Sequence, residues 1–195
     1  MTELILDLDS IIKADSVLFF DMDGTLIDTD LANFLSYKKA IQFVTKSDKD
    51  LVYTPDQRFN RSVLNDKIPN LTENEYDRII NKKEHYYKDF LTETKLNKAI
   101  TDILFKYSKT NKTVLVTNSR EKRAKLILNY HGLTGKFSSI FYRQETNIEK
   151  KVNKYSFAIS CLNISAKSVV IFENEDAEIG DARTAGINNQ NLFKI

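Results

Sequence analysis

The chain has 195 residues, of which 42% are hydrophobic and 29% are charged, as in an ordinary folded protein and unlike a disordered chain. Its 29 Lys and Arg side chains nearly balance its 27 Asp and Glu side chains, which argues against a dedicated nucleic-acid-binding protein. No apolar run approaches the roughly 18 residues that a membrane-spanning helix needs, so we expect no membrane association. The single cysteine, Cys161, excludes an internal disulfide framework and leads us to expect a cytoplasmic protein.

Short apolar runs typical of β-strands recur along the chain. They comprise residues 17–20, 113–116, 139–142, 168–172 and a short fifth candidate at 191–195. Their nearly continuous apolar character predicts strands that are buried on both faces, as in a parallel sheet covered by helices. Apolar residues at helical spacing precede the second and fourth runs, within 95–108 and 155–162. This alternation predicts an α/β fold with a Rossmann-like, doubly wound parallel sheet.

One interval, residues 29–92, breaks the alternation. It contains no convincing strand, and its apolar residues recur at helical spacing, as Leu31, Phe34 and Leu35 do. A crossover helix needs only a dozen or so residues, so this interval is too long for a simple connection. We therefore expect an all-helical subdomain at 29–92, inserted into a core domain formed by 1–28 and 93–195.

Two carboxylates follow the first predicted strand. Asp21 and Asp23 are two residues apart, so in extended backbone they project to the same side. They stand at the carboxyl end of a buried strand, where open α/β sheets bind their ligands. Gly24 allows a sharp turn directly after them. Such a pair can share a metal ion, or divide the duties of a nucleophile and a general acid and base.

The stretch Phe-Phe-Asp-Met-Asp-Gly-Thr-Leu at 19–26 resembles the first motif of the haloacid-dehalogenase-like superfamily. The resemblance extends over the chain and is closest to the branch of phosphoglycolate phosphatases and β-phosphoglucomutases, whose helical cap follows this motif. It implies that Asp21 attacks phosphorus and forms an aspartyl-phosphate. It also implies that Asp23 protonates the leaving oxygen and then activates water. True dehalogenases lack an acid at the second position.

A second motif of this family is a strand that ends in Ser or Thr. Residues 114–116 followed by Thr117 and Asn118 fit it, and the resemblance implies that these two residues bind phosphate oxygens. A basic cluster follows, which we interpret as a solvated helix face, with docking of a charged substrate as the alternative. The cluster comprises Arg120, Lys122, Arg123 and Lys125.

The resemblance also implies a lysine, because a phosphate dianion beside a carboxylate needs a compensating cation. Lys150, Lys151 and Lys154 all lie near the start of the helix that precedes the fourth strand. The spacing best suits Lys151 as the phosphate-binding residue. Lys154 is the alternative if Asn153 caps a shorter helix.

The last motif begins with Glu173 and Asn174, directly after the fourth strand. In the family, an acidic pair at this point helps to hold Mg²⁺. The implied metal ligands are therefore Asp21, Asp23, Glu173 and Asn174. Asn174 stands where the family has an aspartate, so it supplies a neutral oxygen without the charge.

Taken together, these features predict a Mg²⁺-dependent phosphatase that acts on a small phosphorylated metabolite. Within the predicted cap, Arg61 is a tentative substrate-binding residue. Two alternatives stay open: a phosphomutase of the same family, and a non-catalytic phosphate-binding relative whose metal site is degraded. The substrate itself does not follow from the sequence.

Overall fold

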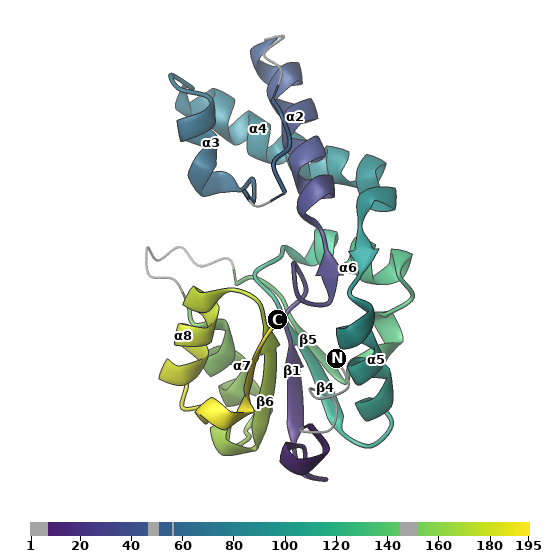
Figure 1. Cartoon of the computed structure of the whole chain (residues 1–195). Coiled ribbons are helices and arrows are strands. Elements are labelled where there is room, and N and C mark those ends of the chain that lie inside the picture. Colours follow the sequence, from purple (N-terminus) through teal and green to yellow (C-terminus); the bar gives the residue numbers. More distant parts are fainter. Residues whose placement is uncertain (1–7, 47–50, 56, 145–151) are drawn as a thin grey trace. The chain divides into compact units, whose positions relative to one another are not determined.

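The computed structural model describes residues 8–46, 51–55, 57–144 and 152–195. The chain divides into two compact units: Asp28–Lys95 forms one, and the segments before and after it form the other (Figure 1). The unit Asp28–Lys95 contains the interval 29–92, for which a helical insertion is expected. Within the described ranges, no helix is long and apolar enough to cross a membrane.

The larger unit, the core unit, contains a sheet of five parallel strands in the order β5-β4-β1-β6-β7. The strands are β1 (Val17–Phe20), β4 (Lys112–Val116), β5 (Ser139–Phe141), β6 (Val169–Glu173) and β7 (Leu192–Lys194). Each coincides with one of the five predicted apolar runs to within one or two residues. The α/β fold with a doubly wound parallel sheet is therefore confirmed.

Helices cover both faces of this sheet. Figure 1 shows α5 (Lys98–Tyr107) and α6 (Glu121–Tyr130) on one side, and α7 (Lys154–Leu162) and α8 (Asp176–Thr184) on the other. The chain winds outward from β1 through β4 to β5, and then returns to β6 on the other side of β1. In such a sheet, ligands bind at the carboxyl ends of the strands beside this reversal. The described part of the unit also contains a helical turn at residues 8–11 and the short 3₁₀ helices η2 (Thr134–Lys136), η3 (Ala166–Ser168) and η4 (Asn189–Asn191).

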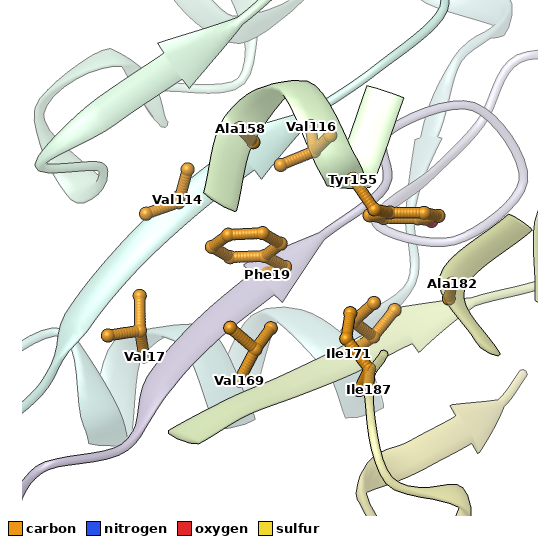
Figure 2. Packing of buried hydrophobic residues seen from close by; sticks show 10 residues of the cluster. All are labelled: Val17, Phe19, Val114, Val116, Tyr155, Ala158, Val169, Ile171, Ala182 and Ile187. Atoms are coloured by element: carbon orange, nitrogen blue, oxygen red, sulfur yellow. The ribbon is translucent and has the colours of Figure 1, made fainter. Parts of the chain in front are cut away.

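The core packing explains why β1 consists entirely of apolar residues. Val17 and Phe19 point to the face covered by α7, where they pack with Tyr155 and Ala158 (Figure 2). The alternate residues of the strand face the other side of the sheet. There Phe20 stacks on Phe172 of β6, with ring centroids 4.9 Å apart. Burial on both faces fixes the strand that carries the two aspartates.

The smaller unit, the helical unit, is made of α2 (Asp30–Thr45), α3 (Arg61–Lys67), α4 (Glu73–Tyr86) and the 3₁₀ helix η1 (Tyr87–Glu93). Its own hydrophobic cluster includes Phe34 and Ile41 of α2, Leu64 of α3 and Ile79 of α4. A capping box between Thr72 and Glu75 begins α4. Two short strands, β2 (Ile27–Asp28) and β3 (Lys95–Leu96), pair where the chain passes between the units.

Candidate active site

The two aspartates lie in a tight turn at the carboxyl end of β1. The Asp21 N–H donates to the Phe172 carbonyl at 3.1 Å, which fixes Asp21 beside the end of β6. Gly24 has a φ of +86°, and its N–H donates to the Ile27 carbonyl at 2.8 Å, which closes the turn. Asp21 and Asp23 are each only 6% exposed. The turn therefore holds two buried carboxyl groups at the point where β4 and β6 flank β1.

Lys154 is the cation that contacts Asp21. Its Nζ lies 2.8 Å from Asp21 Oδ1 and 2.9 Å from Glu173 Oε2. A third carboxylate, Glu178 of α8, places Oε2 at 3.5 Å from the same Nζ. The buried ammonium group of Lys154 thus contacts three carboxylates, which come from the end of β1, from β6 and from α8.

The position of Lys154 follows from the way α7 begins. The Asn153 side chain accepts hydrogen bonds from the N–H groups of Tyr155 and Ser156, both at 3.0 Å, and so caps the helix. Lys154 is the first helical residue after this cap. Lys151, the residue expected to bind phosphate, lies outside the described residues, as does Lys150.

The close approach of these acidic groups changes the pKa values of Asp21 and Lys154. Burial raises the pKa of Asp21, Lys154 lowers it and Glu173 raises it again, and the result is about 7. Burial lowers the pKa of Lys154, but the attraction of Asp21, Glu173 and Glu178 outweighs this effect and raises it above its ordinary value. Lys154 therefore stays cationic, whereas Asp21 changes its charge near neutral pH.

Glu173 is held by four hydrogen bonds. Its Oε1 accepts from the backbone N–H groups of Asn174 and Glu175 at 2.9 and 3.0 Å. Its Oε2 accepts from Lys154 at 2.9 Å and from the Tyr155 hydroxyl at 2.5 Å. Both carboxylate oxygens are thus used to order the loop after β6 and to position Lys154. The sequence offered no sign of the Tyr155 contact, because tyrosine in an amphipathic helix is indistinguishable from a core residue.

Asn174 packs directly against the turn that carries the aspartates. Its Oδ1 accepts a hydrogen bond from the Thr25 hydroxyl at 3.1 Å. A Cβ atom built on Gly24 would lie 2.4 Å from Asn174 Nδ2, so a side chain at position 24 would displace the amide. Asn174 therefore lies against the Asp21–Asp23 turn, on the side of β6.

The second motif lies at the end of β4. Thr117 is 1% exposed, its N–H donates to the Phe141 carbonyl at 2.9 Å, and its Oγ1 accepts from the Ser119 N–H at 3.1 Å. Asn118 is exposed. Ser119 is buried and its hydroxyl donates to Asp23. The turn after β4 therefore contacts the turn after β1 directly.

One residue of the basic cluster does not fit our interpretation of a solvated helix face. Arg123 Nη2 lies 3.0 Å from Asp23 Oδ2, and its side chain is 13% exposed. The interpretation was wrong for Arg123, because α6 turns this side chain toward the end of β1. Lys122 and Lys125 of the same helix are exposed.

Arg61 belongs to the helical unit. It is the first residue of α3, directly after the Asn60 cap, and its carbonyl accepts from the Tyr76 hydroxyl at 3.4 Å. Its side chain is partly exposed. Substrate binding by Arg61 stays a prediction.

The oxygen donors at this site fit Mg²⁺ in type, although the site carries less negative charge than four acidic ligands would supply. The candidate donors are the Asp21 carboxylate and the Asn174 amide oxygen, together with the Asp23 backbone carbonyl, as the family resemblance implies. Glu173 fits less well, because both of its oxygens already accept two hydrogen bonds. The described residues contain no cluster of three or more His, Cys, Asp or Glu suited to a metal.

Comparisons with known proteins identify the family of this chain. The family model described as haloacid dehalogenase-like hydrolase matches residues 18–190. A curated phosphorylated carbohydrates phosphatase from Thermotoga maritima is 27% identical over 183 residues, which cover 87% of this chain and 81% of that protein.

Two solved structures show the same fold at lower identity. The first, from Haemophilus somnus and described as a predicted phosphoglycolate phosphatase, has a TM-score of 0.72 and 19% identity, covering 94% of this chain and 89% of that one. The second, a haloacid dehalogenase-like hydrolase from Streptococcus pneumoniae, has a TM-score of 0.68 and 18% identity, covering 90% of this chain and 83% of that one.

Proposed function

The chain belongs to the haloacid dehalogenase-like hydrolases, and we propose that it is a phosphatase that hydrolyses a small phosphomonoester through an aspartyl-phosphate. The observation that carries the proposal is the contact between the buried Asp21 carboxylate and Lys154, with Asp23 two residues away. The phosphorylated carbohydrates phosphatase of Thermotoga maritima supports a phosphorylated carbohydrate as the substrate class.

In the first half-reaction, an Asp21 oxygen attacks phosphorus while the bond from phosphorus to the leaving oxygen breaks. Asp23 donates its proton to that oxygen, so the alcohol leaves in neutral form. Lys154 stays cationic beside Asp21 and offsets the repulsion between the phosphoryl group and the three carboxylates around it.

In the second half-reaction, Asp23 accepts a proton from water, and the water oxygen attacks the phosphorus of the aspartyl-phosphate. The bond between phosphorus and the Asp21 oxygen breaks, which releases phosphate and restores both side chains. We propose that Thr117 and Asn118 bind the phosphate oxygens, since they stand at the neighbouring strand end. Lys151 stays a candidate for the same role.

We further propose that Asp21, the Asp23 carbonyl and Asn174 hold a Mg²⁺ ion. When bound, this ion would neutralise negative charge on the phosphoryl group. Glu173 is then a positioning residue for Lys154 rather than a direct ligand, because its two oxygens are already occupied by hydrogen bonds.

The test is turnover of 4-nitrophenyl phosphate and of a panel of sugar phosphates, with Mg²⁺ and with a chelator. We expect Mg²⁺-dependent release of phosphate from the wild type and none from Asp21→Asn. Asp102→Asn, on the exposed surface of α5, is the matched control and should retain full activity. Acid quenching during turnover should trap the wild type with the added mass of one phosphoryl group. The absence of this added mass from Asp21→Asn would identify the intermediate. Full activity of Asp21→Asn would refute the proposal.

One observation favours a second candidate, a non-catalytic phosphate-binding protein. Asn174 removes a negative charge from the proposed metal site, which lowers its attraction for Mg²⁺. Binding of inorganic phosphate to the wild type, together with no turnover of any phosphomonoester at saturating Mg²⁺, would favour this candidate.

A further inference from the structure

Two side chains from the turn after β4 and from α6 meet on one oxygen of Asp23. The Ser119 hydroxyl donates to Asp23 Oδ2, and Arg123 Nη2 donates to the same oxygen at 3.0 Å. Arg123 Nη2 also donates to Ser119 Oγ. The three groups therefore form a closed triangle, although Asp23 and Arg123 are 100 residues apart in the chain.

We propose that Arg123 and Ser119 are positioning residues that hold the Asp23 carboxyl group in place for proton transfer to the leaving oxygen. This role rests on the proposed phosphatase activity, in which Asp23 is the general acid. Nothing in the basic composition of α6 distinguishes Arg123 from its neighbours; only the contact with Asp23 does.

Both the Ser119 hydroxyl and Arg123 Nη2 contact the same Asp23 oxygen, Oδ2. A hydroxyl group has one hydrogen, and Ser119 gives it to Asp23 Oδ2 while it accepts from Arg123. Oδ2 therefore faces two donors, one from the turn after β4 and one from α6. The triangle resists rotation of the carboxyl group, because rotation would break both of these contacts.

The surroundings of Arg123 support a role inside the site rather than on the surface. The Arg123 and Asp23 side chains are 13% and 8% exposed, whereas the ion pair between Lys125 and Glu121 of the same helix is 62% and 57% exposed. Ser119 is itself fixed, because its carbonyl accepts from the Arg143 N–H at 3.0 Å. A guanidinium group placed on a fixed hydroxyl is suited to hold a carboxylate at a defined angle.

The test compares phenyl, 4-nitrophenyl and 2,4-dinitrophenyl phosphate, whose leaving groups need a general acid less and less. For Arg123→Gln we expect kcat/KM to fall about 10- to 100-fold with phenyl phosphate, because part of the general-acid contribution is lost. With 2,4-dinitrophenyl phosphate the loss should stay below about threefold, since this leaving group departs without a proton. Asp23→Asn should show the same trend more steeply.

Three further variants separate positioning from a general effect on the fold. Arg123→Lys keeps a cation and should recover part of the activity on phenyl phosphate. Ser119→Ala removes one side of the triangle and should shift the substrate preference in the same direction as Arg123→Gln. Lys122→Gln, on the exposed face of α6, is the matched control and should behave as the wild type. An equal loss of activity on all three substrates, or no loss, would overturn the positioning role.

A structural measurement keeps the inference separate from the activity. Crystal structures of the wild type and of Arg123→Gln should show the Asp23 carboxyl group rotated or spread over several orientations in the variant only. If the wild type hydrolyses none of the three phosphates, the proposed function fails, whereas this comparison still decides whether Arg123 holds Asp23. An unchanged Asp23 side chain in Arg123→Gln would overturn the inference.

Discussion

The Tyr155 hydroxyl donates to Glu173 Oε2 at 2.5 Å, so that a residue of α7 and a residue of β6 orient each other inside the core unit. Both side chains are buried, and the same Glu173 oxygen accepts from Lys154 at 2.9 Å. The tyrosine ring packs in the hydrophobic cluster around Phe19 (Figure 2), and its hydroxyl reaches the polar site. The Tyr155 side chain thus belongs both to the apolar core and to the candidate active site.

The first prediction concerns this contact. In Tyr155→Phe the ring stays in place, and Glu173 loses one of its four donors. We expect the free energy of unfolding to fall by about 1–3 kcal/mol, as for a buried charged acceptor that loses a partner. Urea denaturation at pH 7 measures the change. Tyr130→Phe, at an exposed position of α6, is the control and should leave the midpoint unchanged. Equal stability of Tyr155→Phe and the wild type would contradict the prediction.

The second prediction concerns the central cation. Lys154→Met leaves Asp21, Glu173 and Glu178 buried together without compensation, so the protein should lose about 3–5 kcal/mol of stability. The loss should be largest at alkaline pH and shrink as the pH falls, because protonation of the carboxylates relieves their repulsion. Denaturant unfolding at several pH values measures both effects. Lys122→Met, whose side chain is solvated, should show no such pH dependence, and a loss in Lys154→Met that is independent of pH would count against the charge argument.

The third prediction follows from the pKa of Asp21, which burial and the neighbouring carboxylates raise to about 7. In the metal-free protein, Asp21 is therefore mostly neutral below this pH and mostly ionised above it. A metal ion binds the ionised form, so Mg²⁺ affinity should increase between about pH 6 and about pH 8, with release of a proton on binding. Calorimetry in two buffers with different ionisation enthalpies measures this proton. Asp21→Asn lacks both the titrating group and the only charged ligand of the proposed set, so it should show neither the proton nor comparable binding, and proton uptake by the wild type would refute the argument.

The fourth prediction concerns Asn174. Asn174→Asp restores a negative charge beside Asp21 with little change in size, so the Mg²⁺ concentration for half-maximal activity should fall by roughly tenfold. Activity titrated with Mg²⁺ gives this concentration directly. Asn129→Asp, at an exposed position of α6, adds the same charge far from the turn and serves as the control. If the two variants titrate alike, Asn174 is not a ligand.

Much of the fold could be predicted because the strands of the core unit are buried on both faces. The sequence of β1 is apolar throughout, so its boundaries at Val17 and Phe20 matched the prediction. The position of Asp21 and Asp23 at a ligand-binding edge followed from the topology of the sheet. These inferences depend on local sequence and on general rules of α/β folds.

The parts that could not be predicted depend on contacts between distant segments. The contact of Lys154 with Asp21 depends on the residue at which α7 begins, and the Asn153 cap sets that start at Lys154. The charge of Arg123 fits an exposed helix face, and only its contact with Asp23, 100 residues earlier in the chain, shows that it belongs to the site. Side-chain rotamers and the rotation of each helix about its axis decide such contacts, and neither can be predicted from the local sequence pattern.

The ends of the inserted segment lie side by side: β2 pairs with β3, and the Asn97 N–H donates to the Leu26 carbonyl at 2.8 Å. The chain therefore leaves the core unit and returns to it at the same place. Because the two ends lie side by side, we expect changes of length within Asp28–Lys95 to leave the spacing of β1 and α5 unchanged. The helical unit can therefore diverge in sequence while the turn that carries Asp21 and Asp23 keeps its position in the core unit.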